Sequence, residues 1–111
     1  MSVASGIKAT LAATGLTIAK NNYMGANTSY ITFNYSTKPD KFAADDPQYE
    51  AYLIHIHLIT PVTVNTTAYE AQIKALLVAA GYAYPTTVDA SDDPAENHIV
   101  FETEIEVYVG G

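Results

Sequence analysis

Residues 49–60 read YEAYLIHIHLIT, and this stretch decides the fold class. Its side chains alternate in character with a period of two, which is the pattern of a β-strand whose two faces meet different surroundings. The even-numbered face carries Tyr52, Ile54, Ile56 and Leu58, and the odd-numbered face carries Leu53, His55, His57 and Ile59. Pro61 ends the pattern, because proline has no backbone N–H for a strand ladder. The stretch predicts a long strand with one apolar and one mixed face.

Other segments around it also predict strands. Residues 30–35 (YITFNY) alternate in the same way, and so does the final segment, His98 to Val109. Tyr82 to Val88 predicts an edge strand, because Pro85 interrupts it and proline is tolerated where one side of a strand faces solvent. Leu16 to Met24 is ambiguous, and an extended conformation is one of its readings.

Two segments have the apolar spacing of helices. Val3 to Thr14 predicts a short helix, and Gly15 supplies the left-handed residue that often closes one. A second helix is predicted from Thr67 to about Ala80, with apolar residues at helical spacing. Thr67 and Glu70 fit a capping box, in which the hydroxyl and the carboxylate satisfy unpaired amide groups of the first turn.

The order of these elements is helix, two or three strands, helix, two strands. Strands in succession favour hairpins, so we expect an α+β fold with a mostly antiparallel sheet of four to five strands and two helices packed on one face. The 111 residues, 49% of them apolar, suffice for a single domain over residues 1–111. Ser36 to Gln48, polar and with two prolines, is expected to be a long loop.

The charge excludes several classes of partner. Twelve acidic residues face five lysines, there is no arginine, and the formal net charge is -7. Such a field repels polyanions and anionic membranes, so we expect neither specific nucleic-acid binding nor membrane binding. No signal peptide and no apolar stretch long enough to span a bilayer is found. With no cysteine, there is no thiol nucleophile and no thiolate metal site, and we expect no cofactor.

Three histidines make the one pattern that could hold a metal. His55 and His57 are two apart on the central strand, so both rings project from one face. His98 and Glu102 could complete a site if the last strand lies alongside. The alternative is that the histidines pair with neighbouring carboxylates or lie in an interface. The second reading is favoured, and no metal site is assigned.

Three glutamates line one face of the last strand, namely Glu102, Glu104 and Glu106. Acid–base catalysis would need environments that separate their pKa values, and three like neighbours on an open face do not indicate that. A solvated sheet face is the simpler interpretation, and charges there also discourage aggregation of sheet edges. No catalytic residues are assigned, and the chain is not expected to be an enzyme.

Several short strings in this order resemble the tail-terminator and tail-completion (head–tail joining) proteins of long-tailed bacteriophages. They are YITF at 30–33, FAADD at 42–46, YLIHIHL at 52–58, IKALL at 73–77 with AGY at 80–82, and the segment 92–101 that contains His98. The similarity covers about residues 3–108 as a pattern of elements, and no single motif is diagnostic. The absence of arginine and the histidine pair are departures from the pattern, and they leave the branch of the family open.

The resemblance implies an architectural role. Members of the family close the growing tail tube, typically as a ring of six subunits, and dock onto the head. The expected partners are therefore further copies of the chain, the tail-tube protein and the head connector proteins. The expected location is the head-proximal end of the tail in a virion assembled in the host cytoplasm. An acidic channel would let DNA pass, because like charges repel, and Glu102, Glu104 and Glu106 are the candidates for lining it.

The candidate contact residues come from the long loop, the histidine pair and the glutamate row. They are Lys41, Phe42, Asp45, Asp46, His55, His57, Glu102, Glu104 and Glu106. Two other functions remain open. One is a different head–tail joining or minor capsid component, or a small protein-binding module. The other is a metal-dependent enzyme built around His55, His57 and His98.

Overall fold

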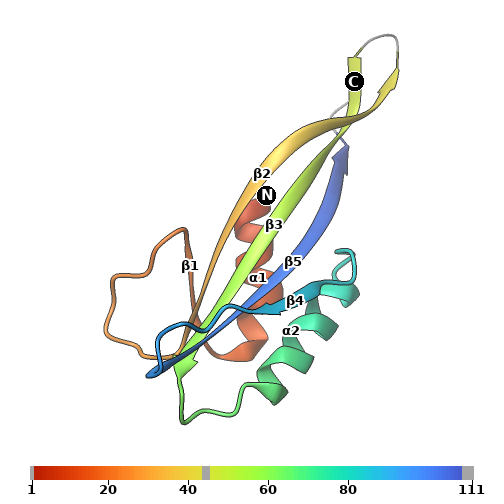
Figure 1. Ribbon diagram of the computed structural model, residues 1–111. Helices are drawn as coiled ribbons and strands as arrows, with labels where there is room; N and C mark the ends of the chain where they lie inside the picture. Colours follow the sequence, from red (N-terminus) through yellow and green to blue (C-terminus); the bar gives the residue numbers. More distant parts are fainter. Residues whose placement is uncertain (1, 44–45, 109–111) are drawn as a thin grey trace.

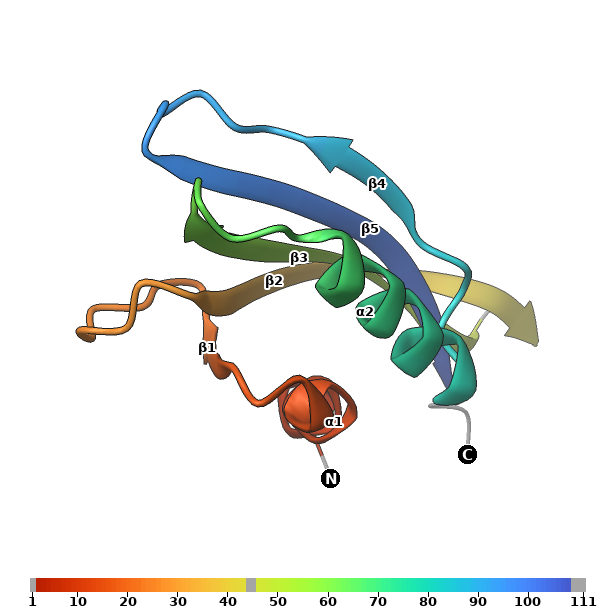
Figure 2. The same ribbon diagram turned by 90° about the horizontal axis from the view of Figure 1, so that it is seen from below.

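The computed structural model describes residues 2–43 and 46–108, and in residues 39–43 and 46–48 it describes the backbone alone. The elements are α1 (Val3–Leu11), the 3-10 turn η1 (Ala12–Thr14), β1 (Thr17–Lys20), β2 (Tyr30–Ala43), β3 (Asp46–Pro61), α2 (Thr67–Ala79), β4 (Thr86–Asp89) and β5 (Glu96–Tyr108). They form one five-stranded sheet in the order β1-β2-β3-β5-β4. Both helices cover the same face of this sheet (Figure 1 and Figure 2). The predicted α+β class is confirmed.

The strand that decided the fold class, β3, lies at the centre of the sheet. It pairs antiparallel with β2 and with β5, and Ile56 stands in register between Phe33 and Phe101. β4 pairs antiparallel with the outer side of β5. β1 pairs parallel with β2, which the sequence did not indicate. Asn21, at a φ of 67°, turns the chain out of β1, and residues 22–29 lead it back to the start of β2.

The core lies between the helices and the sheet face that they cover. Ile7 and Leu11 of α1 and Ile73 and Leu77 of α2 are fully buried against the sheet. The sheet contributes Ile31, Phe33, Ile54, Ile56, Leu58, Ile99 and Phe101. Burying such side chains stabilises the fold by about 1.5–3 kcal/mol each. In β2, β3 and β5 the helix-facing side is the apolar face that the alternation predicted.

The start of α2 differs in detail from the predicted capping box. The residue before the helix is Thr66, whose hydroxyl donates to the Glu70 carboxylate at 2.7 Å. The Thr67 amide donates instead to the side chain of Asn65, at 2.9 Å. Thr67 and Glu70 therefore do not form the predicted reciprocal cap, because Asn65 already satisfies the first amide.

The segment from Ser36 to Gln48 is not the long loop that we predicted. β2 and β3 continue as paired strands through it, with Ser36 opposite Leu53 and Ala43 opposite Asp46. The end of this hairpin extends past both helices (Figure 1). Prolines disfavour central strands but are accepted at edges, and Pro39 lies in β2 beyond the stretch that β1 covers. The molecule is elongated as a result, with extents of 54 × 24 × 24 Å.

Candidate functional site

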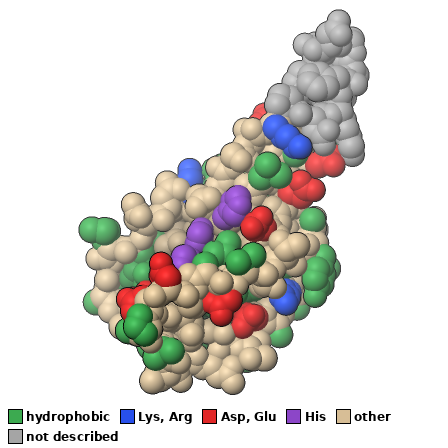
Figure 3. Space-filling view, in the orientation of Figure 1, with side chains coloured by type: hydrophobic (Ala, Val, Ile, Leu, Met, Phe, Trp, Pro, Cys, Tyr) green, Lys and Arg blue, Asp and Glu red, His purple; other side chains and the backbone are tan. Residues whose placement is uncertain are grey.

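The sheet face opposite the helices carries most of the predicted site residues. On this open face the register places His55 beside Glu102, and Ile59 between Tyr30 and His98. Figure 3 shows histidine and carboxylate side chains gathered on this face, with lysines toward its margins. The pairing of β3 with β5 thus brings His55, His57, His98 and Glu102 onto one part of this face, as expected if the last strand lies alongside the central one.

His57 and His98 are in direct polar contact on this face. Nδ1 of His57 lies 2.8 Å from Nε2 of His98, a hydrogen bond in which one ring donates and the other accepts. Asn34 approaches the other side of the His57 ring, with its amide nitrogen 3.4 Å from Nε2. Partial burial lowers the pKa of His57 below 6.5, and the nearby His98 and His55 lower it further. The pair therefore favours the state in which His57 is neutral.

His55 has a looser partner. Its Nε2 lies 3.9 Å from a carboxylate oxygen of Glu102, and both side chains are about half exposed, at 44% and 51%. An exposed pair of this kind contributes little to stability, and only when the histidine is protonated. Glu104 and Glu106 continue the row of carboxylates toward the end of β5, and both are exposed.

The histidine cluster does not make a metal centre in the part of the chain that the structure describes. Across these residues, no group of three histidine, aspartate or glutamate side chains is placed to hold a metal ion. His57 and His98 turn ring nitrogens toward each other and thereby satisfy each other's hydrogen bonding. A metal-dependent reaction around His55, His57 and His98 gains no support from this geometry.

The predicted contact residues of the hairpin are only partly described. Lys41 and Phe42 lie in β2 and Asp46 begins β3, and for these three residues the backbone alone is described. Asp45 lies outside the described residues. The backbone register places Phe42 opposite Pro47, close to the end of the hairpin.

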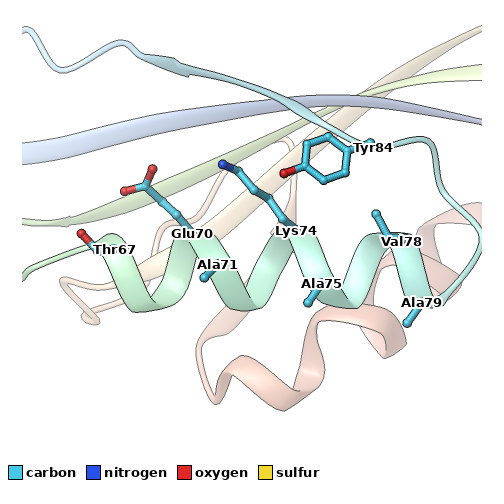
Figure 4. A pocket seen from close by; sticks show the side chains of 8 residues that line it. All are labelled: Thr67, Glu70, Ala71, Lys74, Ala75, Val78, Ala79 and Tyr84. Carbon is cyan, nitrogen blue, oxygen red and sulfur yellow. The ribbon is translucent and has the colours of Figure 1, made fainter.

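A groove along α2 is a feature that the sequence analysis missed. It has a volume of about 760 Å³ and is lined by Thr67, Glu70, Ala71, Lys74, Ala75, Val78, Ala79 and Tyr84. Figure 4 shows the Tyr84 ring lying over the helix near Lys74, and 73% of Tyr84 is exposed. The sequence analysis considered only the core-facing side of this helix. The signal was the spacing of Ala71, Ala75 and Val78, which places a second apolar strip on its outer side.

Two smaller grooves lie where β4 leaves β5 uncovered. β4 pairs only with residues 99–102 of β5, and before it the Ala83 amide donates to the Glu104 carbonyl at 2.9 Å. One groove of about 420 Å³ is lined in part by His55, Glu102 and Glu104. The other, of about 380 Å³, is lined by Gly81, Tyr82, Ala83, Glu104, Ile105 and Glu106. The glutamate row therefore borders hollows at the side of the sheet.

Comparison with known proteins identifies the fold alone. No family model and no curated protein matches the chain. One solved structure, whose name states no function, superimposes with a TM-score of 0.61 over 98% of this chain and 89% of its own, at 15% identity. At that identity the likeness concerns the arrangement of the elements. None of the described helices has the length and apolar character to cross a membrane.

Proposed function

We propose that the chain is a structural virion protein that caps the tail tube of a long-tailed bacteriophage and joins it to the head connector as a ring. Its partners are then further copies of itself, the tail-tube protein and the connector proteins. Its place is the head-proximal end of the tail, after assembly in the host cytoplasm. The resemblance of the short strings in residues 3–108 motivates this proposal.

The observation that carries the proposal is the shape of the molecule. One small α+β body bears a two-stranded arm that extends past its helices and gives the molecule its length of 54 Å. A projecting hairpin presents backbone and side chains to a neighbour without disturbing the core, as an assembly protein requires. Lys41, Phe42, Asp45 and Asp46 remain the candidate contacts of this arm.

The open face of the sheet suits the lining of a DNA channel. Glu102, Glu104 and Glu106 stand in a row on it and are exposed. Carboxylates repel the phosphates of DNA, so those of this row that no neighbouring subunit contacts would not hold the genome as it passes through a channel lined by this face. A ring structure in which this face pointed outward would contradict that part of the proposal.

The test is deletion of the gene from the phage genome, followed by electron microscopy of the particles. Without a cap that stops growth, we expect tail tubes longer than those of the parent phage, together with heads that lack tails. Expression of the chain from a plasmid should restore normal particles. Tail tubes of normal length that fail to join heads would instead favour the role of a different head–tail joining protein. Normal particles would refute both the tail-cap role and the joining role.

A further inference from the structure

The charges of this chain are divided along the sequence. The first 39 residues contain Lys8, Lys20 and Lys38 and no aspartate or glutamate. The rest of the chain contains Lys41, Lys74 and all twelve acidic residues, so formal charges of +3 and -10 make up the net -7. A division of this kind is a physical property of the folded surface only if the two parts of the chain lie on different sides.

The fold places most of the two parts on different sides, although Asp40 and Lys41 lie on β2 with Lys38. α1, β1 and β2 occupy one side of the molecule, and β5 and β4 lie beyond β3 on the other (Figure 2). We call the exposed lysines Lys8, Lys20 and Lys38 the lysine flank. Glu102, Glu104 and Glu106 on β5 are the glutamate flank.

The glutamate flank is hollowed and the lysine flank has an uncovered strand. Glu104 and Glu106 border the groove of about 380 Å³ beside Ala83. On the other side, β1 pairs only with residues 30–33 of β2, and no described strand lies outside β2 from Asn34 onward. An uncovered edge strand of this kind presents backbone groups to a neighbour.

We propose that the lysine flank of one copy docks against the glutamate flank of a second copy, head to tail. The second copy is the occupant because the chain carries both halves of the complementary pair, one on each side. A contact between two different patches is heterologous, and repeated around an axis it closes into a ring. The inference rests on the proposed ring function in that it names the surfaces by which such a ring would be held together.

The register of the sheet gives the contact a specific pair. Lys38 is opposite Ala51, and Ala51 is opposite Glu106, so Lys38 and Glu106 stand in one row on the open face. In a ring whose symmetry axis runs parallel to the strands, the rotation that relates neighbouring copies leaves each residue at the same height along the axis. Lys38 on β2 of one copy is therefore at the same height as Glu106 on β5 of the next copy.

The experiment measures self-association of the purified chain by sedimentation equilibrium. We expect the wild type to associate with a dissociation constant tighter than about 1 mM. Lys38→Glu and Glu106→Lys should each weaken association by about tenfold or more, because each creates a contact between like charges. An equal mixture of the two variants should recover association to within about threefold of wild type, because each then meets an opposite charge in the other.

Matched controls separate this contact from a general effect of charge. Lys74→Glu has the same net charge as Lys38→Glu, and Asp92→Lys the same as Glu106→Lys, but neither lies on the Lys38–Glu106 row. Both controls should associate like the wild type, and circular dichroism should show all variants folded. Recovery in the mixture cannot come from a contact within one chain.

Three outcomes would overturn the proposal: a wild type that stays monomeric up to about 1 mM, variants that associate like their controls, or no recovery on mixing. These outcomes are distinct from failure of the proposed function, which shows as normal particles after gene deletion. A head-to-tail assembly with normal particles would retain the contact and refute the tail role.

Discussion

At the scale of single residues, the surroundings of His57 lower its pKa and so constrain its ionisation. It is half-buried on the open face and faces His98 from β5 and His55 on its own strand, while Asn34 of β2 is uncharged. The carboxylate of Glu102 on β5 lies beside His55, with an oxygen 3.9 Å from Nε2 of that ring. Protonation of His57 would place positive charge beside other histidines in a partly dry site, so the folded protein opposes it.

This constraint predicts that the fold loses stability on mild acidification. The pKa of His57 is lowered in the folded state, so as pH falls below 6.5 the unfolded chain binds a proton that the folded chain resists. The free energy of unfolding should therefore be lower at pH about 5.5 than at pH about 7.5, in urea titrations followed by circular dichroism. His57→Asn should make this dependence flatter. An equal dependence in that variant would assign the effect to other groups.

At the scale of the elements, the sequence predicted well what alternation and spacing determine locally. β3, β5, the first half of β2 and both helices were found close to their predicted places, because each buries an apolar face of its own. The second half of β2 and the first residues of β3 were missed, since a polar run with Pro39 and Pro47 has the composition of a loop. These two segments become strands because they pair with each other, which is a tertiary contact rather than a property of either segment.

The hairpin arm is predicted to serve contacts rather than stability. Asp40 is opposite Tyr49, so replacing residues 41–48 with Asn-Gly would close the hairpin with a two-residue turn. The core lies elsewhere, so the free energy of unfolding should change by no more than about 1 kcal/mol. Phe101→Ala, which truncates a fully buried ring, should instead cost about 3–5 kcal/mol.

The same shortened variant should fail to assemble. Particle formation would be scored by electron microscopy after complementation of a phage that lacks the gene. Tails of normal length with the shortened protein would show that the arm is dispensable, and an unfolded variant would show that it is structural.

At the scale of the whole molecule, the candidate site could be predicted only in part. The histidine and glutamate rows follow from alternation, and their meeting follows once β3 and β5 are neighbours. The spacing of Ala71, Ala75 and Val78 indicates the apolar strip of the α2 groove, but the position of Tyr84 over that strip and the hollows beside β5 depend on where the chain between α2 and β4 crosses the sheet. The division of charge at residue 39 was visible in the sequence. Its meaning required the strand order, which puts β1 and β2 on the side of the sheet opposite β5 and β4.

That arrangement predicts the form that assembly takes in solution. A heterologous contact either closes at a fixed number of subunits or extends without limit, whereas a two-fold contact stops at a dimer. We expect light scattering at two protein concentrations to give one discrete mass near six times 11.9 kDa, because the proposed role requires a closed ring. Higher salt should weaken the assembly, since exposed charges are screened beyond about 8 Å at physiological ionic strength. A dimer whose mass is unaffected by salt would contradict both the head-to-tail contact and its electrostatic origin.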